Sequence, residues 1–142
     1  MNELPIFFDR QGQPITMTEF ERLHSVGAAE RERNLRVAKT IIGPLFVSTV
    51  WLGIDYGLGM GPPLIFETMV FPVNRNEASV LHPELAEWLE AVWRYPTEGL
   101  ALAGHDKVCV DLRVLQSNIE MSEQVEREAI AHEQRKRHND RP

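Results

Sequence analysis

The sequence has little of several features that would identify its class of protein at once. A single cysteine, Cys109, stands in 142 residues, which excludes an internal disulfide framework and a cysteine-based zinc site. No run of about 18 apolar residues occurs, so no membrane-spanning helix is predicted. The N-terminal MNELPIFFDRQGQ is acidic at position 3, and its short apolar run soon ends at Asp9 and Arg10, unlike a secretory signal. These absences predict a protein that stays in a reducing cytoplasm.

Basic residues are scarce outside the C-terminal end. The net charge is −6, yet the tail QRKRHNDRP (134–142) carries four cations against one carboxylate, or +3, which leaves −9 on the rest of the chain. Affinity for nucleic-acid backbones comes largely from clustered Lys and Arg, so nucleic acid is not expected as the main partner. The basic tail is typical of a solvated helix end, with cations favourably placed at the C-terminal dipole, and it could also contact an acidic partner.

The chain does contain an ordinary apolar fraction, 43%, and a length that suits one domain with one core. Val, Ile, Phe, Trp and Thr are concentrated in RVAKTIIG (36–43), FVSTVWLGID (46–55) and LIFETMVFPV (64–73), which glycine or proline bounds. This composition predicts three consecutive antiparallel strands, a meander. LPIFFD (4–9), closed by the turn RQGQP, is predicted to be a short strand or an extended arm.

Helical patterns lie on both sides of the predicted sheet. Thr16 or Thr18 can cap a helix over ITMTEFERLHS, and GAAERERNL continues or connects it. PELAEWLEAVW indicates a short helix before Pro96. Thr97 is then a natural cap for a helix to residue 116 with an apolar stripe, and Ser117 offers a second cap and a break.

The predicted fold is therefore an α+β domain, with a three- to four-stranded antiparallel meander and helices packed on one face. Residues 1–116 form this domain, and 117–142 form a polar C-terminal helix that packs on a partner chain or frays. The second face of the sheet would stay open. That face and the C-terminal helix both need cover, which predicts a homo-oligomer.

The glycine-rich span DYGLGMGPP lies between the second and third predicted strands. A Walker-type loop needs a lysine and a following helix, whereas Pro62 and Pro63 lead here into a strand. The span is therefore predicted to be a long connection in which Asp55 caps the turn. On a register that pairs Ile54 with Leu64, Trp51 lies opposite Glu67. The even-numbered residues 46–54 and 64–70 would face the core, and the open face would carry Val47, Thr49, Trp51, Asp55, Ile65, Glu67, Met69 and Phe71.

The residues able to do chemistry have no recognisable catalytic or metal-ligand spacing. His105 is expected to hydrogen-bond a neighbouring element, and its obvious partners, Asp55, Glu67 and His24, match no pattern such as HExxH. Asp55 and Glu67 could do acid–base work, but no nucleophile or set of oxyanion donors accompanies them. Cys109 is typical of a packing residue. No catalytic residue, metal or cofactor is therefore assigned.

The stretches VSTVWLGIDYGLGMGPPLIFETMVF and RYPTEGLALAGHDKV carry a resemblance to a known family. They resemble small proteins encoded by tailed bacteriophages and by phage-derived regions of bacterial genomes. Members tend to share VSTVWLG, a following D-[H/Y], GPPLIFETMVF, RY-[S/T]-T-E and an A-GH pair. Tyr56 and Pro96 depart from this pattern, and the C-terminal end falls outside it. The resemblance implies a phage accessory protein in the cytoplasm of an infected or lysogenic host.

The predicted function is a non-catalytic binding protein that helps a phage resist host defence. It would sequester a small signalling molecule such as a cyclic nucleotide, or block a host defence protein, and aromatic stacking would suit a nucleobase. Two alternatives stay open, an oligomeric structural or regulatory protein and a small hydrolase. The residues predicted to bind come from the open face, from segments expected near it and, for His105, from the helix after Thr97. They are Trp51, Asp55, Tyr56, Glu67, Met69, Arg94, Tyr95 and His105.

Overall fold

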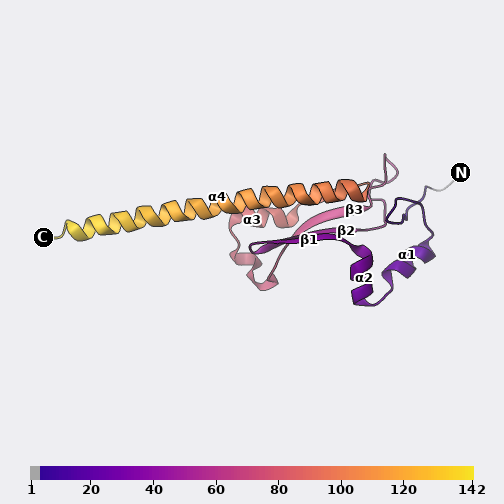
Figure 1. Cartoon of the computed structure of the whole chain (residues 1–142), viewed down its shortest axis with the longest axis horizontal. Coiled ribbons are helices and arrows are strands. Elements are labelled where there is room, and N and C mark those ends of the chain that lie inside the picture. The colour runs from indigo at the N-terminus through magenta and orange to yellow at the C-terminus, as the bar shows by residue number, and fades with distance from the viewer. Residues whose placement is uncertain (1–3) are drawn as a thin grey trace.

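The computed structural model describes residues 4–142, which form a four-stranded antiparallel sheet with one long helix lying lengthwise along it (Figure 1). The strands lie in chain order and are β1 (Arg36–Ile42), β2 (Leu45–Trp51), β3 (Phe66–Pro72) and β4 (Val92–Tyr95). The helix α4 (Glu98–Asn139) packs on one face of this sheet. The predicted α+β meander with helices on one face is confirmed.

Shorter helices flank the sheet. They are α1 (Met17–His24), α2 (Ala28–Leu35), α3 (Pro83–Ala86) and the 3-10 turns η1 (Arg75–Val80) and η2 (Glu87–Glu90). Thr16, one of the two predicted caps, accepts a hydrogen bond from the amide of Glu19 and begins α1. The helix predicted over 83–93 was too long at its C-terminal end, because residues 92–95 adopt a β conformation and pair with β3 as the fourth strand.

The predicted register between β2 and β3 was wrong by one residue. Trp51 lies opposite Phe66, and Glu67 lies opposite Val50. Ile54 does not pair with Leu64, because Gly53, at φ +74°, turns the chain and Ile54 bridges to Phe7 of the N-terminal arm. A one-residue slip moves every side chain of a strand to the other face. The core side of β2 therefore carries odd-numbered residues, and the predicted even-numbered face of β3 is correct.

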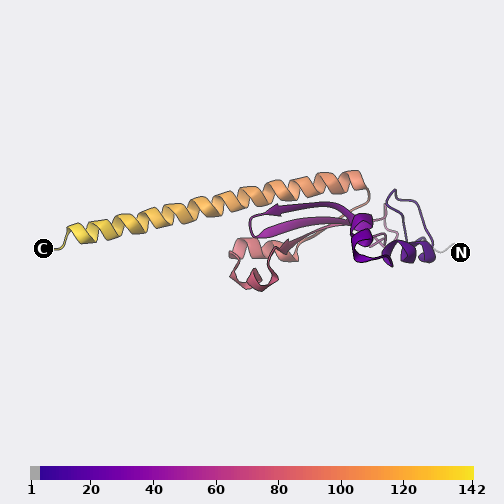
Figure 2. The ribbon, with the colours of Figure 1, turned by 60° about the horizontal axis from the view of Figure 1, so that its bottom comes forward.

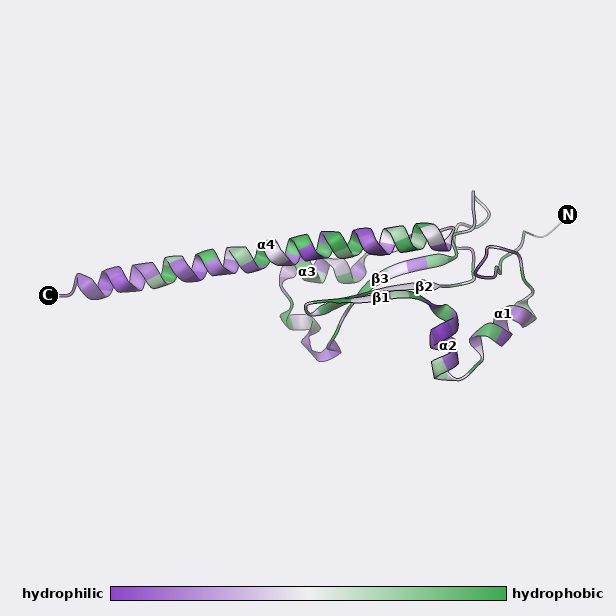
Figure 3. Ribbon diagram, in the orientation of Figure 1, coloured by the Kyte–Doolittle hydropathy of each residue, from purple (hydrophilic) through white to green (hydrophobic). Residues whose placement is uncertain are grey.

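The helix α4 runs without a break for 42 residues, so the predicted break at Ser117 is absent. No glycine or proline follows Gly104 before the helix ends, and its residues favour helix. Thr97 caps it by accepting from the amide of Leu100, as predicted. Ile119 is its last buried side chain, and beyond it α4 projects past the sheet in both views (Figures 1 and 2). That projecting half is mostly hydrophilic (Figure 3).

Two hydrophobic clusters form the core. The first joins the β1–β2 hairpin to the middle of α4 and to α3, and includes Leu45, Val47, Val70 and Leu112. The second joins the other end of the sheet to the arm and to α1, and includes Phe8, Trp51, Ile65, Phe66 and Ala101. Among residues 4–142, no helix is long and apolar enough to cross a membrane.

Candidate binding face

The sheet surface that faces away from α4, here called the open face, is mainly apolar. Strand pairing places three rows of side chains on it: Ile41–Phe46–Phe71, Lys39–Ser48–Met69–Val92 and Val50–Glu67–Arg94. Phe46 and Phe71 stack with ring centroids 5.3 Å apart, and the ammonium of Lys39 lies 4.4 Å from the Phe46 ring centroid. Ile41 is 65% exposed and Phe71 37%. Large apolar groups therefore remain in contact with water on a rigid surface.

One corner of the open face brings together three of the predicted binding residues. Arg94 Nε donates to Glu67 Oε2 at 3.1 Å, across the β3–β4 pair. The Arg94 guanidinium also lies 4.5 Å from the ring centroid of Tyr56, a cation–π arrangement. Arg94 thus links β3, β4 and the loop between β2 and β3. Met69 lies in the neighbouring row.

Two of the predicted aromatic residues lie elsewhere. Trp51 is only 2% exposed and packs in the second core cluster, with its ring 5.2 Å from the ring of His24. Its predicted place on the open face was wrong because of the register slip. Tyr95 packs against the second cluster, and a Cβ on Gly104 of α4 would lie 2.1 Å from the Tyr95 hydroxyl. Neither ring can stack on a ligand bound at the open face.

Asp55 holds the loop between β2 and β3 together. Its carboxylate accepts hydrogen bonds from the amides of Gly57, Gly59 and Leu64 at 2.7, 3.1 and 3.0 Å. Desolvation by burial opposes ionisation, but these three backbone amides together outweigh it and lower the pKa of Asp55. The predicted turn-capping role of Asp55 is confirmed.

His105 belongs to a buried chain of hydrogen bonds between α4 and the sheet. Its Nε2 lies 2.8 Å from Thr40 Oγ1 and its Nδ1 lies 2.8 Å from Thr49 Oγ1, which in turn contacts Thr68 Oγ1 at 2.6 Å. Burial lowers the pKa of His105, which favours the neutral ring. Burial also raises the pKa of the neighbouring Cys109 thiol. These groups join α4 to β1, β2 and β3, which is the structural role expected for His105.

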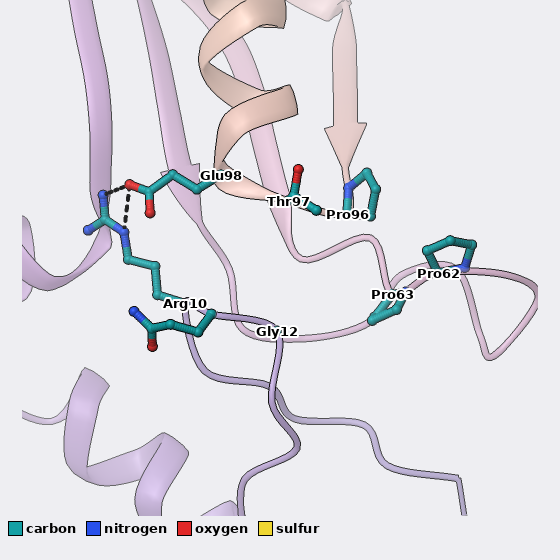
Figure 4. A pocket seen from close by; sticks show the side chains of 8 residues that line it. Arg10, Gly12, Pro62, Pro63, Pro96, Thr97 and Glu98 are labelled. Atoms are coloured by element: carbon teal, nitrogen blue, oxygen red, sulfur yellow. Dashed lines mark hydrogen bonds and ion pairs between the residues drawn. The ribbon is translucent and has the colours of Figure 1, made fainter.

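A surface pocket of about 500 Å³ opens where the N-terminal turn meets the start of α4 (Figure 4). Arg10 crosses it and donates to Glu98 Oε1 through Nε at 3.0 Å and Nη2 at 2.5 Å. Prolines form much of the remaining wall, namely Pro62, Pro63 and Pro96. The charges in this pocket already neutralise each other, so it offers little to attract a charged ligand.

A second pocket, of about 380 Å³, lies beside Trp51 between the N-terminal turn, α1 and α2. Its lining includes Arg10, Arg33 and Asn34. Within residues 4–142, Trp51 Nε1 is buried without a hydrogen-bond partner. A buried donor left without an acceptor costs about 1–3 kcal/mol, so an acceptor at this point would stabilise the protein.

The sequence prediction missed much of the open face. Lys39, Ile41, Phe46, Val50 and Val92 all lie on it, and none was predicted to bind. The alternation of apolar residues along each strand could be seen in the sequence. The sequence did not show that even-numbered residues of β2 pair with odd-numbered residues of β3, because that register depends on the length of the connecting loop.

Comparison with known proteins adds no family assignment. No family model, no curated protein and no solved structure matches the chain. Within the described part of the chain, no group of three or more His, Cys, Asp and Glu side chains is arranged to hold a metal ion.

Proposed function

We propose that this is a non-catalytic accessory protein that binds a protein partner through the open face, in the phage setting that the sequence resemblance implies. One observation carries the proposal: α4 takes up one side of the sheet, while Ile41, Phe46 and Phe71 remain on the other in contact with water. A contiguous apolar patch on a rigid antiparallel sheet usually marks an interaction surface.

The charges on this face indicate the chemistry of the partner. Glu67 and Arg94 neutralise each other. Lys39 has no carboxylate within 4 Å among residues 4–142, and its ammonium lies over Phe46. We therefore infer a partner that presents apolar side chains to the Phe46–Phe71 stack and a carboxylate to Lys39. Aromatic anchors with a charged rim are typical of such interfaces.

The groups that would serve a hydrolase are engaged in holding the fold. His105 is held between two threonines, Asp55 by three amides, and the thiol of Cys109 is buried. A catalytic nucleophile or base must come within hydrogen-bond distance of the substrate. His105 and Cys109 are too deeply buried for that, and both carboxylate oxygens of Asp55 already accept backbone amides. This arrangement favours the binding function over the hydrolase.

Site-specific photo-crosslinking in host cells tests the proposal. A photoreactive phenylalanine analogue at position 71 should form one covalent adduct of defined mass, and the same analogue at Ile130, also exposed, should not. The purified adduct partner should then bind the wild-type protein and lose at least tenfold in affinity to Phe71→Glu or Lys39→Glu. Equal labelling from both positions, or an affinity that neither Phe71→Glu nor Lys39→Glu changes, would refute a partner at the open face.

A small ligand is the second candidate, favoured by the partnerless Nε1 of Trp51 beside its pocket. Native mass spectrometry before and after denaturation tests it. A stoichiometric molecule that is released on unfolding and absent from Trp51→Phe, which keeps an aromatic ring but lacks the donor, would support a small-ligand function. A wild-type protein of unchanged mass would contradict it.

A further inference from the structure

The side of α4 that faces away from the sheet carries an apolar stripe, here called the outer stripe: Val110, Val114, Met121 and Val125. Each of these side chains is between 55% and 66% exposed. Val110 and Met121 are eleven residues apart, as are Val114 and Val125. Eleven residues span about three turns, so the stripe runs nearly parallel to the helix axis. It begins over the sheet-backed half of α4 and ends on the projecting half.

The apolar positions of the outer stripe are spaced symmetrically along the helix. Reversed about a point between Ser117 and Asn118, Val110 exchanges with Val125, and Val114 exchanges with Met121. The same reversal exchanges Glu98 with Arg137, which are close to the two ends of α4. The midpoint of the stripe is thus close to the midpoint of the helix. A surface that matches its own reverse can pair with a second copy about a two-fold axis.

We propose that two copies of the protein associate through the outer stripes of α4, antiparallel, with the two-fold axis beside Ser117 and Asn118. In this arrangement the projecting half of each helix lies along the sheet-backed half of the other. The proposal is independent of the proposed function, because the outer stripe and the open face lie on opposite sides of the molecule. A dimer so formed presents two open faces that point away from each other.

Charge complementarity supports the second copy as the occupant. The reversal sets Lys107 opposite the partner's Glu128, on both sides of the axis. Within each helix, Lys107 already pairs with Asp111 at 3.0 Å, and Gln124 donates to Glu128 at 3.2 Å. Across the interface, Lys107 would face the partner's Glu128, and Asp111 would face the partner's Gln124, so that the two pairs form one cluster of four groups.

The size of the contact suits a dimer of moderate affinity. Overlap from residue 98 to residue 137 is about 60 Å long at about 1.5 Å per residue, and a helix is about 10 Å wide. The footprint is therefore on the order of 600 Å² per copy, near the roughly 800 Å² per partner of standard interfaces. Free in water, a projecting helix of this polarity is at best marginally stable, and the dimer would cover one side of it.

Sedimentation velocity of the full chain tests the association. We expect twice the 16.3 kDa monomer mass for the wild type and the monomer mass for Met121→Glu. Ile130→Glu is the matched control, because Ile130 is 53% exposed on the same helix. It lies two and a half turns after Met121 and therefore on the opposite side of the helix from the outer stripe. A wild-type monomer at all concentrations overturns the proposal, as does an unchanged dimer of Met121→Glu.

Disulfide trapping tests the orientation. Ser117→Cys, beside the axis, should cross-link to its own copy under mild oxidation, while Val110→Cys alone should not. Mixing Val110→Cys with Val125→Cys should yield the mixed disulfide. In an antiparallel dimer the two Val110 positions are about 22 Å apart along the axis, so efficient self-linking of Val110→Cys would indicate a parallel dimer and overturn the proposal.

A charge swap tests the pairing across the axis. Lys107→Glu should weaken the dimer by about tenfold, because two like-charged pairs replace two opposite ones. Adding Glu128→Lys to the same chain should restore the wild-type affinity. A second substitution that weakens the dimer further would show that these two positions do not face each other.

Discussion

Replacing His105 with leucine should destabilise the fold, although leucine fills a similar volume and is apolar. His105 is 2% exposed and makes two hydrogen bonds of 2.8 Å, to Thr40 and Thr49. Each is worth about 1 kcal/mol net, and the threonine hydroxyls left behind add part of a desolvation penalty. We expect a loss of about 2–3 kcal/mol, a large part of the roughly 5–15 kcal/mol that stabilises a typical domain.

Urea denaturation at pH 7.5, followed by tryptophan fluorescence, measures this loss. Leu102→Ala on the exposed side of the same helix is the control and should cost less than about 1 kcal/mol. The double variant Thr40→Val/His105→Leu should be less destabilised than the sum of the two single variants, since the partners are removed together. A His105→Leu protein as stable as the wild type would refute the reasoning, because the hydrogen-bonded chain would then contribute nothing net.

Three further predictions concern individual side chains. In the unfolded chain His105 takes up a proton at about pH 6.5, whereas burial lowers its pKa in the folded protein. Its contribution to the unfolding free energy should therefore be constant above that pH and decline below it. His105→Leu should remove this part of the pH dependence in urea titrations. Asp55→Asn should cost about 2 kcal/mol, because the charge and the bond to Gly59 are lost, and it should speed proteolysis of the loop. Gly104→Ala should lower the melting temperature, although alanine usually favours a helix by about 1 kcal/mol, because its Cβ would collide with Tyr95; a raised melting temperature would contradict that contact.

The sequence predicted the elements whose causes are local. Runs of β-branched and aromatic residues ended by Gly43 or Pro44 marked the strands, and Thr97 marked the start of α4. Register was not predictable in the same way, because it depends on how residues 52–65 leave and rejoin the sheet. Gly53 turns that segment towards the N-terminal arm, which only the folded chain brings there. The burial of Trp51 follows from this long-range contact.

The break predicted at Ser117 fails for a different reason. Ser117 and Glu120 match a helix start in type and spacing, but a cap forms only where the preceding backbone leaves the helix. Nothing before Ser117 interrupts the helix, so its residues continue it. A local start signal is thus not sufficient to begin a helix. The polarity of the residues after Ser117 shows where packing against the sheet ends, and not where the helix ends.

The ion pair of Arg10 with Glu98 joins residues that are 88 positions apart in the chain. The strands of the meander, by contrast, are joined by connections of 2 to 19 residues, and closing a long loop costs more chain entropy than closing a short one. The N-terminal arm can dock only once the loop after β2 and the first turn of α4 are both in place. We therefore expect it to fold after the sheet and to detach before the sheet opens, so that amide hydrogens such as that of Phe8, bonded to the Gly53 carbonyl, exchange ahead of those in β2.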